Sequence, residues 1–143
     1  MLLQQELTPH LNTITAYGNG FIEINAQKFH QPVFLRPNGN IQEWNIRSLD
    51  DINLDMLEKI AGVTHASSDV FDFLEDQVKR YENGPELMII GTGKTQRFLP
   101  LHITAPFLQS RIGIETMDSQ AAARTYNILM SEGRDIVLAL FIE

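Results

Sequence analysis

The sequence has no cysteine, and this absence excludes several kinds of chemistry together. A disulfide framework, a thiolate nucleophile, a cysteine-bound iron–sulfur cluster and a thiolate zinc site all need that residue. No serine lies in a G-x-S-x-G motif, so the sequence does not indicate a hydrolase nucleophile. The histidines lack the spacing of metal ligands, and we expect neither a metal nor a cofactor; they are His10, His30, His65 and His102.

Long apolar runs and clusters of basic residues are also lacking. The longest apolar run, residues 136–142, is far shorter than the roughly 20 residues of a membrane-spanning helix, so we expect no membrane insertion. A formal net charge of −7 argues against nucleic acid as a partner, because phosphate binding needs clustered lysine and arginine. The first residues have the features of neither a signal nor a transit peptide, which predicts a mature chain that begins at Met1 and stays in the cytoplasm.

The length of 143 residues fits one domain with a substantial core. The acidic excess is confined to one stretch, because ten acidic and three basic residues lie between Asp50 and Glu86 while the rest of the chain has eight of each. We therefore expect a single domain, 1–143, with three parts: an N-terminal β unit (about 11–47), an acidic helical segment (about 50–82) and a C-terminal core (about 86–142).

The N-terminal unit alternates apolar stretches with turn residues. Residues 17–20 form a turn rich in residues that tolerate positive φ, which predicts a hairpin over residues 11–25. Residues 32–36 and 41–44 indicate two further strands around a second turn. The sequence therefore predicts an antiparallel β unit in the first third of the chain.

Two helices are predicted in the acidic segment. The first runs from a cap at Asn53 or Asp55 to a stop at Gly62. The second begins at Ser67 or Ser68, and its apolar stripe recurs at helical spacing as far as Tyr81. Three carboxylates line its polar side and form either a solvated face or a patch for a basic partner: Asp69, Asp72 and Asp76.

The C-terminal core has the order strand, helix, strand, helix, strand, with crossovers long enough for parallel pairing. Residues 87–90 and 136–142 are continuous apolar runs, so we expect two strands that are buried on both faces. Residues 112–115 predict the strand between them. Asp118 or Ser119 caps the last helix, and Gly133 ends it.

Residues 91–95, Gly-Thr-Gly-Lys-Thr, imitate the end of a nucleotide-binding P-loop. Met88 stands where that motif needs its first glycine, and Pro100 interrupts the helix that should follow, so the P-loop is not supported. Two interpretations stay open for the turn. Its amides form a small anion-binding nest, or its glycines only allow the chain to turn.

Other polar residues are expected beside this turn. The second core strand ends with the polar residues Glu115, Thr116 and Asp118. If this strand and the one at residues 87–90 are parallel neighbours, that end lies next to the turn. Asp118 is also explained by helix capping alone. Lys94, Arg97 and Arg36 could add positive charge. The candidate ligand-binding crevice therefore comprises Arg36, Gly91, Thr92, Gly93, Lys94, Arg97, Glu115, Thr116 and Asp118.

Spaced motifs in residues 86–98, 113–119 and 121–134 resemble those of a small single-domain family that includes the mitochondrial complex I assembly factor 3 and the adipogenesis-associated protein of animals. The resemblance implies an α/β fold with α+β elements: a central mixed sheet, helices on one face and an N-terminal antiparallel β layer on the other. It implies no established enzyme activity. Ala123 stands where many relatives have a cysteine, so any thiol chemistry of relatives is excluded here.

Two functional hypotheses follow. The first is a non-enzymatic, assembly-factor-like module of the bacterial cytoplasm that binds a protein partner of unknown identity. It depends on the resemblance and on the lack of a complete catalytic set. The second is a small-molecule, anion-binding protein or enzyme that uses the turn at residues 91–95 with residues 115–118.

Overall fold

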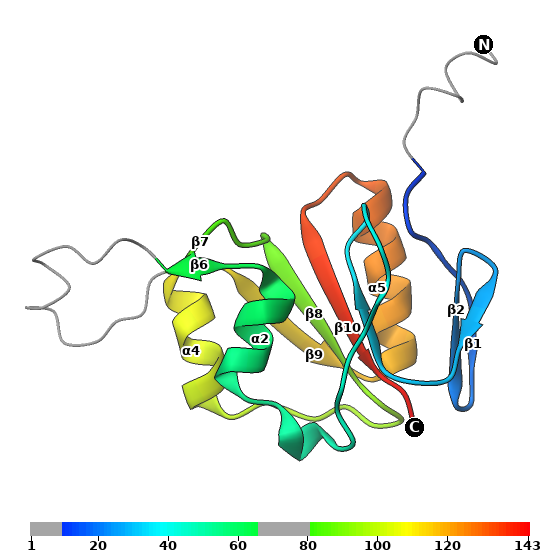
Figure 1. The fold of residues 1–143 in the computed structure, drawn as a ribbon, viewed down its shortest axis with the longest axis horizontal. Coiled ribbons are helices and arrows are strands. Elements are labelled where there is room, and N and C mark those ends of the chain that lie inside the picture. Colours follow the sequence, from blue (N-terminus) through cyan, green and yellow to red (C-terminus); the bar gives the residue numbers. More distant parts are fainter. Residues whose placement is uncertain (1–9, 66–80) are drawn as a thin grey trace, which may run out of the picture.

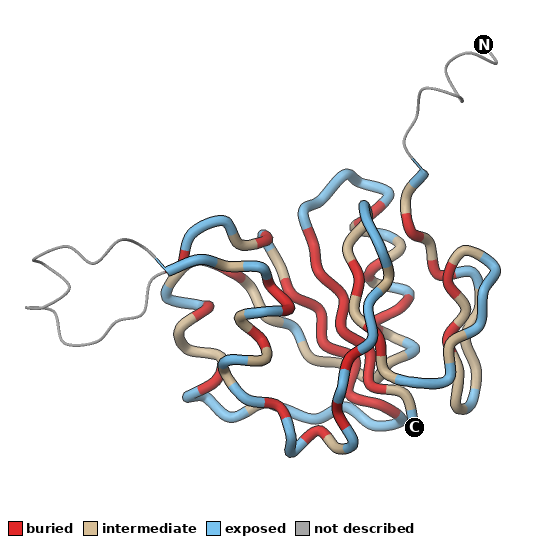
Figure 2. The backbone as a smooth tube through the Cα atoms, in the orientation of Figure 1, coloured by how far each residue is buried: buried red, intermediate tan, exposed pale blue. Residues whose placement is uncertain are grey.

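The two longest strands pair with each other at the centre of the structure. This computed structural model describes residues 10–65 and 81–143. Strand β8 (Leu87–Thr92) runs parallel to β10 (Ile136–Phe141), in a register that places Leu87 beside Ile136 and Thr92 beside Phe141. All residues of β10 are buried, as Figure 2 shows, because side chains pack on both faces of this strand.

Three further strands complete a mixed five-stranded sheet with the order β5-β4-β10-β8-β9. Strand β9 (Gly113–Met117) runs parallel to β8 and forms one edge. Strands β4 (Val33–Leu35) and β5 (Gln42–Glu43) add antiparallel pairs beyond β10 and form the other edge.

Helices cover both faces of this sheet (Figure 1). On one face, α2 (Leu54–Ala61) and α4 (Leu101–Gln109) pack over the side chains of Met88, Ile90 and Val137. A short 3-10 helix, η1 (Leu49–Asp51), precedes α2. On the other face lies α5 (Ser119–Ser131).

A second, three-stranded antiparallel sheet is attached on the α5 side, and it consists of β1 (Ile14–Gly18), β2 (Phe21–Ile24) and β3 (Gln27–Phe29). Its apolar side chains share one core with α5 and with Ile89, Leu138 and Leu140 of the main sheet. A two-stranded pair, β6 (Thr64–His65) with β7 (Tyr81–Glu82), lies at the opposite end of the molecule. The antiparallel layer therefore reaches the main sheet on the side that α5 covers.

The predicted fold class is confirmed: an α/β structure with a central mixed sheet and an antiparallel β layer. Two details differ from the prediction. Helix α5 shares its face with the antiparallel layer, so the helices are not confined to one face. The strands of residues 11–47 are divided between two sheets, because β4 continues the main sheet by pairing with β10.

The helix ends follow their local signals. Asn53 caps α2 by accepting a hydrogen bond from the backbone N–H of Met56, and Gly62 ends it with φ of 68°. Asp118 caps α5 in the same way, through the N–H of Ala121. Most of the second predicted acidic helix lies outside the described residues. Tyr81, the last residue of its predicted apolar stripe, belongs to strand β7, which corrects that end of the prediction.

Candidate functional site

A cavity of about 290 Å³ opens at the carboxyl ends of β8 and β10. Its wall combines the β1–β2 hairpin, the turn after β8, the first residues of α5 and the end of β10. The lining residues are Tyr17, Gly18, Asn19, Gly20, Phe21, Ile22, Gly93, Lys94, Asp118, Ser119, Gln120, Leu140, Phe141, Ile142 and Glu143. Open α/β sheets commonly bind ligands at this end of their strands.

Ser119 joins the three segments that meet at the floor of the cavity. Its hydroxyl donates a hydrogen bond to the carbonyl of Phe141 (2.6 Å) and accepts one from the N–H of Gly93 (2.8 Å). Its own backbone N–H donates to the carbonyl of Gly93 (2.9 Å). The start of α5 is therefore fixed to both central strands.

The backbone amides of the glycine turn already have protein acceptors. The N–H of Gly93 donates to the hydroxyl of Ser119, and the N–H of Lys94 donates to the carboxylate of Glu143 (2.9 Å). An anion in a nest here would therefore have to displace a hydroxyl and a carboxylate. The cavity also carries the carboxylates of Asp118 and Glu143 against the single ammonium of Lys94, a balance that disfavours an anion.

The hairpin side of the cavity is held by Tyr17. Its hydroxyl accepts a hydrogen bond from Arg124 Nη1 (3.1 Å), and the guanidinium lies 5.7 Å from the ring centroid. The hydrogen bond to the Tyr17 hydroxyl, together with the electrostatic effect of Tyr17, raises the pKa of Arg124 above its usual value. Sequence reasoning missed Tyr17, because no local pattern indicates that the hairpin turn packs beside α5.

The structure brings together only part of the predicted crevice. Gly93, Lys94 and Asp118 line the cavity. Gly91 and Thr92 are buried inside β8 rather than in a turn, and among the two glycines only Gly93 has a positive φ, 92°. The Thr92 hydroxyl lies 2.7 Å from the carbonyl of Thr95 and accepts the N–H of Arg97 (3.2 Å), so it closes the loop internally.

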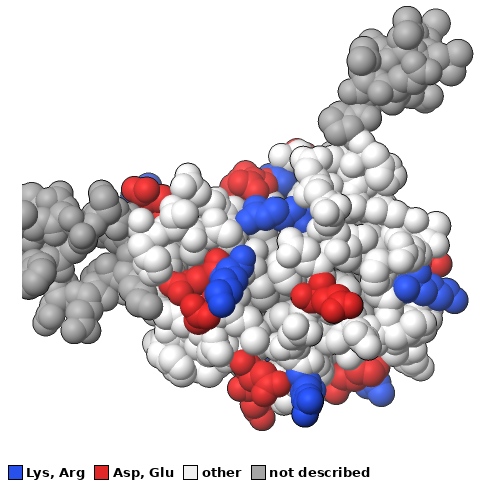
Figure 3. All heavy atoms as spheres, in the orientation of Figure 1, with Lys and Arg blue, Asp and Glu red and all other residues white. Residues whose placement is uncertain are grey.

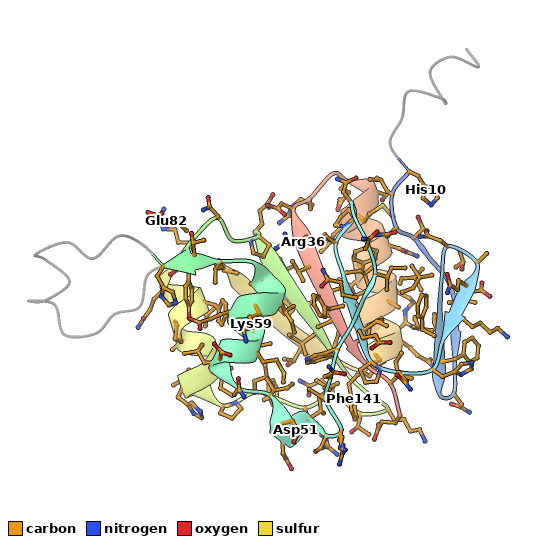
Figure 4. The ribbon with its side chains drawn as sticks, in the orientation of Figure 1. His10, Arg36, Asp51, Lys59, Glu82 and Phe141 are labelled. Atoms are coloured by element: carbon orange, nitrogen blue, oxygen red, sulfur yellow. The ribbon has the colours of Figure 1, made fainter. Side chains whose placement is uncertain are left out.

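Arg36 lies at the other end of β10, as the labels of Arg36 and Phe141 in Figure 4 show. Its guanidinium donates to the carbonyl of Ala61 and lies 3.7 Å from the carboxylate of Asp135. Arg36 therefore fastens β4 to α2 and does not join the cavity. It had been predicted as part of the crevice, but the antiparallel direction of β4 carries it away.

Arg97 lies in the loop between β8 and α4 and does not line the cavity. The other predicted residues lie on the edge strand β9 or outside the described residues. Glu115 is exposed on β9, and the Thr116 hydroxyl accepts a hydrogen bond from the Gln96 side chain (3.2 Å). The predicted partner surface, Asp69, Asp72 and Asp76, lies outside the described residues. Within residues 10–65 and 81–143, no three His, Asp or Glu side chains gather as a metal site.

Charge and apolar surface complete the description. On the face shown in Figure 3, acidic and basic side chains form small separate groups rather than one basic patch. Large apolar side chains are exposed at Phe98 (85%), Leu101 (73%), Leu108 (52%) and Ile128 (61%). The helices of the described residues are all too short or too polar to cross a membrane.

These features define a small α/β protein with a mixed five-stranded sheet, a cavity at the carboxyl ends of β8 and β10 and exposed leucines on α4. The chain belongs to the family described as "protein of unknown function (DUF498/DUF598)", whose model matches residues 14–141. The resemblance inferred from the sequence motifs is thereby confirmed.

Relatives with names or solved structures support this membership. The chain is 31% identical over 134 residues to a Bos taurus protein named NADH dehydrogenase [ubiquinone] 1 alpha subcomplex assembly factor 3, covering 93% of this chain and 61% of that protein. A crystal structure from Bordetella parapertussis matches with a TM-score of 0.77 and 38% identity over 95% of this chain and 99% of that one. A solution structure from Bordetella pertussis, described as a Mth938-like domain, matches with a TM-score of 0.73 and 39% identity over 94% and 88% of the two chains.

Proposed function

We propose that this protein is a non-enzymatic, assembly-factor-like module that binds another protein. The name of the bovine relative supports an assembly role, although this chain spans only 61% of that relative's length. The solved relatives from two Bordetella species support a bacterial source, and we propose the cytoplasm as its compartment.

The apolar outer side of α4 is the observation that carries the proposal. Leu101 and Leu108 are seven residues apart, so they project from the same side of the helix, and both are more than half exposed. Ile103 and Phe107 on the opposite side are buried in the core. Single exposed leucines are ordinary, whereas aligned apolar side chains on one element mark a protein contact.

Phe98 extends this feature into the segment before α4. Its side chain is 85% exposed, three residues before Leu101. Exposed aromatic rings are costly to leave in water and are enriched where protein partners bind. We name Phe98, Leu101 and Leu108 the α4 apolar stripe.

Affinity capture from cells that express the tagged protein tests this proposal, at low and at moderate salt. The Leu101→Ser/Leu108→Ser variant should lose a stoichiometric partner, because burying each leucine contributes about 2 kcal/mol to binding. Substitution of exposed polar residues on the same helix, His102→Ser/Gln109→Ser, is the matched control and should retain it. Failure to recover any stoichiometric partner with the unchanged protein at either salt, or equal recovery with both variants, would count against the proposal.

The cavity favours a second candidate, the binding of a small molecule. Its volume of about 290 Å³ lies just below the usual range of ligand pockets, and its wall mixes aromatic, amide and charged side chains. The proposed ligand is not restricted to anions, because two carboxylates line the cavity with one ammonium.

A thermal-shift screen with nucleotides, sugar phosphates, carboxylates and amines tests the second candidate. A ligand at 100-fold its dissociation constant should stabilise the folded state by roughly 2.7 kcal/mol. Lys94→Ala should change the shift, whereas Lys59→Ala, on α2 and away from the cavity, should not. The absence of any shift, or a shift that both variants leave unaltered, would remove the support for this candidate.

A further inference from the structure

Strand β9 forms one edge of the main sheet. In the described part of the chain, it pairs only with β8. The opposite edge, β5, has two residues, whereas β9 has five. An edge strand of this length presents a row of backbone donors and acceptors that another strand can use.

The register identifies which backbone groups face outward. Gly113 donates its N–H to the carbonyl of Glu86, and the parallel ladder continues with Glu115 and Met117 bonding β8. Because bonding alternates along a strand, the N–H and C=O groups of Ile114 and Thr116 point away from β8. Among the described residues, none forms a backbone hydrogen bond with these four groups.

Glu115 stands at the centre of this edge and gives it a charge. Its side chain is exposed and has no ion pair in the described part of the chain. A second copy of β9, paired antiparallel so that all five residues match, would place two Glu115 carboxylates opposite each other. Like charges in that position destabilise strand pairing, so the edge disfavours its own copy.

From this geometry we infer that β9 accepts one extended segment of another protein, which carries a lysine or arginine opposite Glu115. The segment bonds the outward backbone groups of Ile114 and Thr116, as in β-augmentation. The net charge of −7 also favours a basic segment, because opposite charges attract the two proteins to each other. The inference rests on the proposed protein-binding function and assigns it a second contact, separate from the α4 apolar stripe.

Two short extended peptides of alternating threonine and valine, one with lysine and one with glutamate at the centre, test this directly. Amide NMR and hydrogen exchange should show protection of Ile114 and Thr116 with the lysine peptide, which should bind about tenfold more tightly than the glutamate peptide. Glu115→Lys should reverse that preference.

Thr116→Pro removes one outward N–H but none of the bonds to β8, because the N–H of Thr116 points away from β8. Proline is tolerated at such positions of an edge strand. It should weaken the lysine peptide about tenfold, while Thr116→Val, which keeps the N–H, should not. No protection at Ile114 and Thr116 at millimolar peptide, or equal binding to the Thr116→Pro variant, overturns the inference.

Sedimentation of the protein alone provides the other decisive outcome. A dimer that Thr116→Pro dissociates would show that the occupant is a second copy and would overturn the inference. Because these assays need no captured partner, their failure leaves the test of the α4 apolar stripe independent.

Discussion

The side-chain amide of Asn127 pairs with both backbone groups of Ile14, which lies 113 residues away in the sequence. Asn127 Oδ1 accepts the N–H of Ile14 (2.9 Å), and Nδ2 donates to its carbonyl (2.8 Å). One helix side chain thus provides a hydrogen-bond partner for both the N–H and the C=O of a β1 residue, as a neighbouring strand would. Tyr126, the preceding residue, donates its hydroxyl to the carbonyl of Asn12 (2.8 Å), so α5 holds the antiparallel layer by two adjacent side chains.

Asn127→Ala should therefore destabilise the fold by about 2 kcal/mol, because it leaves an N–H and a C=O of the buried Ile14 without their partner. Urea unfolding measures the change. Gln120→Ala, at an exposed position of the same helix, is the control and should have little effect. Equal stability of the two variants would show that water replaces the Asn127 amide at no cost.

Gly91→Ala should be more harmful than the same change at Gly113. An added Cβ at Gly91 would lie 2.7 Å from Leu140 Cδ2 and 3.0 Å from the backbone Cα of Ser119, which cannot move easily. At Gly113 the nearest atom, 3.0 Å away, is the flexible end of Leu87. We expect a loss of about 2 kcal/mol at Gly91 and a smaller loss at Gly113, measured by thermal unfolding. The reverse order would contradict this packing.

Ser119→Ala should loosen the junction of α5 with β8 and β10. It removes the acceptor of Gly93 N–H and the donor to Phe141, and we expect a loss of about 1.5 kcal/mol in unfolding free energy. Ser131→Ala, at the exposed end of α5, removes one local bond to Ile128 and should cost less. Hydrogen exchange at the Gly93 amide should quicken in Ser119→Ala alone.

The ion pair between Glu86 and Arg134 should make the free energy of unfolding depend on pH. Arg134 Nε donates to Glu86 (2.9 Å), and this bond, with the Asp135 N–H, lowers the pKa of Glu86 from its ordinary value of 4.5. Because the pKa of Glu86 is lower in the folded than in the unfolded state, its charge stabilises the fold at pH values above the unfolded-state pKa. This stabilisation is lost as the pH falls through the folded-state pKa.

Glu86→Gln should accordingly lower the melting temperature at about pH 7 and have no effect below the folded pKa, where the carboxyl of the unchanged protein is neutral. Glu82→Gln is the control, since Glu82 has no ion pair in the described part of the chain. A melting-temperature difference that stays constant across the pH range would contradict this role of the Glu86 charge.

Local signals predicted much of the secondary structure because they act within a few residues. Asn53 and Asp118 cap their helices through N–H groups three residues ahead, and the apolar runs became β8 and β10. The second acidic helix is not decided, since most of it lies outside the described residues. The strand β3 was missed, because residues Gln27–Phe29 are too short and polar to stand out by pattern.

The candidate site was predicted in part, for a reason that lies in strand direction. Gly93, Lys94 and Asp118 do lie together, because β8 and β9 are parallel neighbours and their carboxyl ends lie at the same end of the sheet. Arg36 does not join them, because β4 runs antiparallel to β10 and carries it to the other end. No local pattern encodes the direction of a strand relative to a distant one.

Local patterns were enough to predict the strands β8 and β10, the caps of α2 and α5 and the family, because periodicity, capping and spaced motifs involve residues that are close in the chain. Three features followed only from the packed structure: Tyr17 lines the cavity, the Ser119 hydroxyl accepts the N–H of Gly93, and β9 stands at the edge of the main sheet among the described strands. These depend on contacts between residues far apart in the chain, which form only when the whole core is packed.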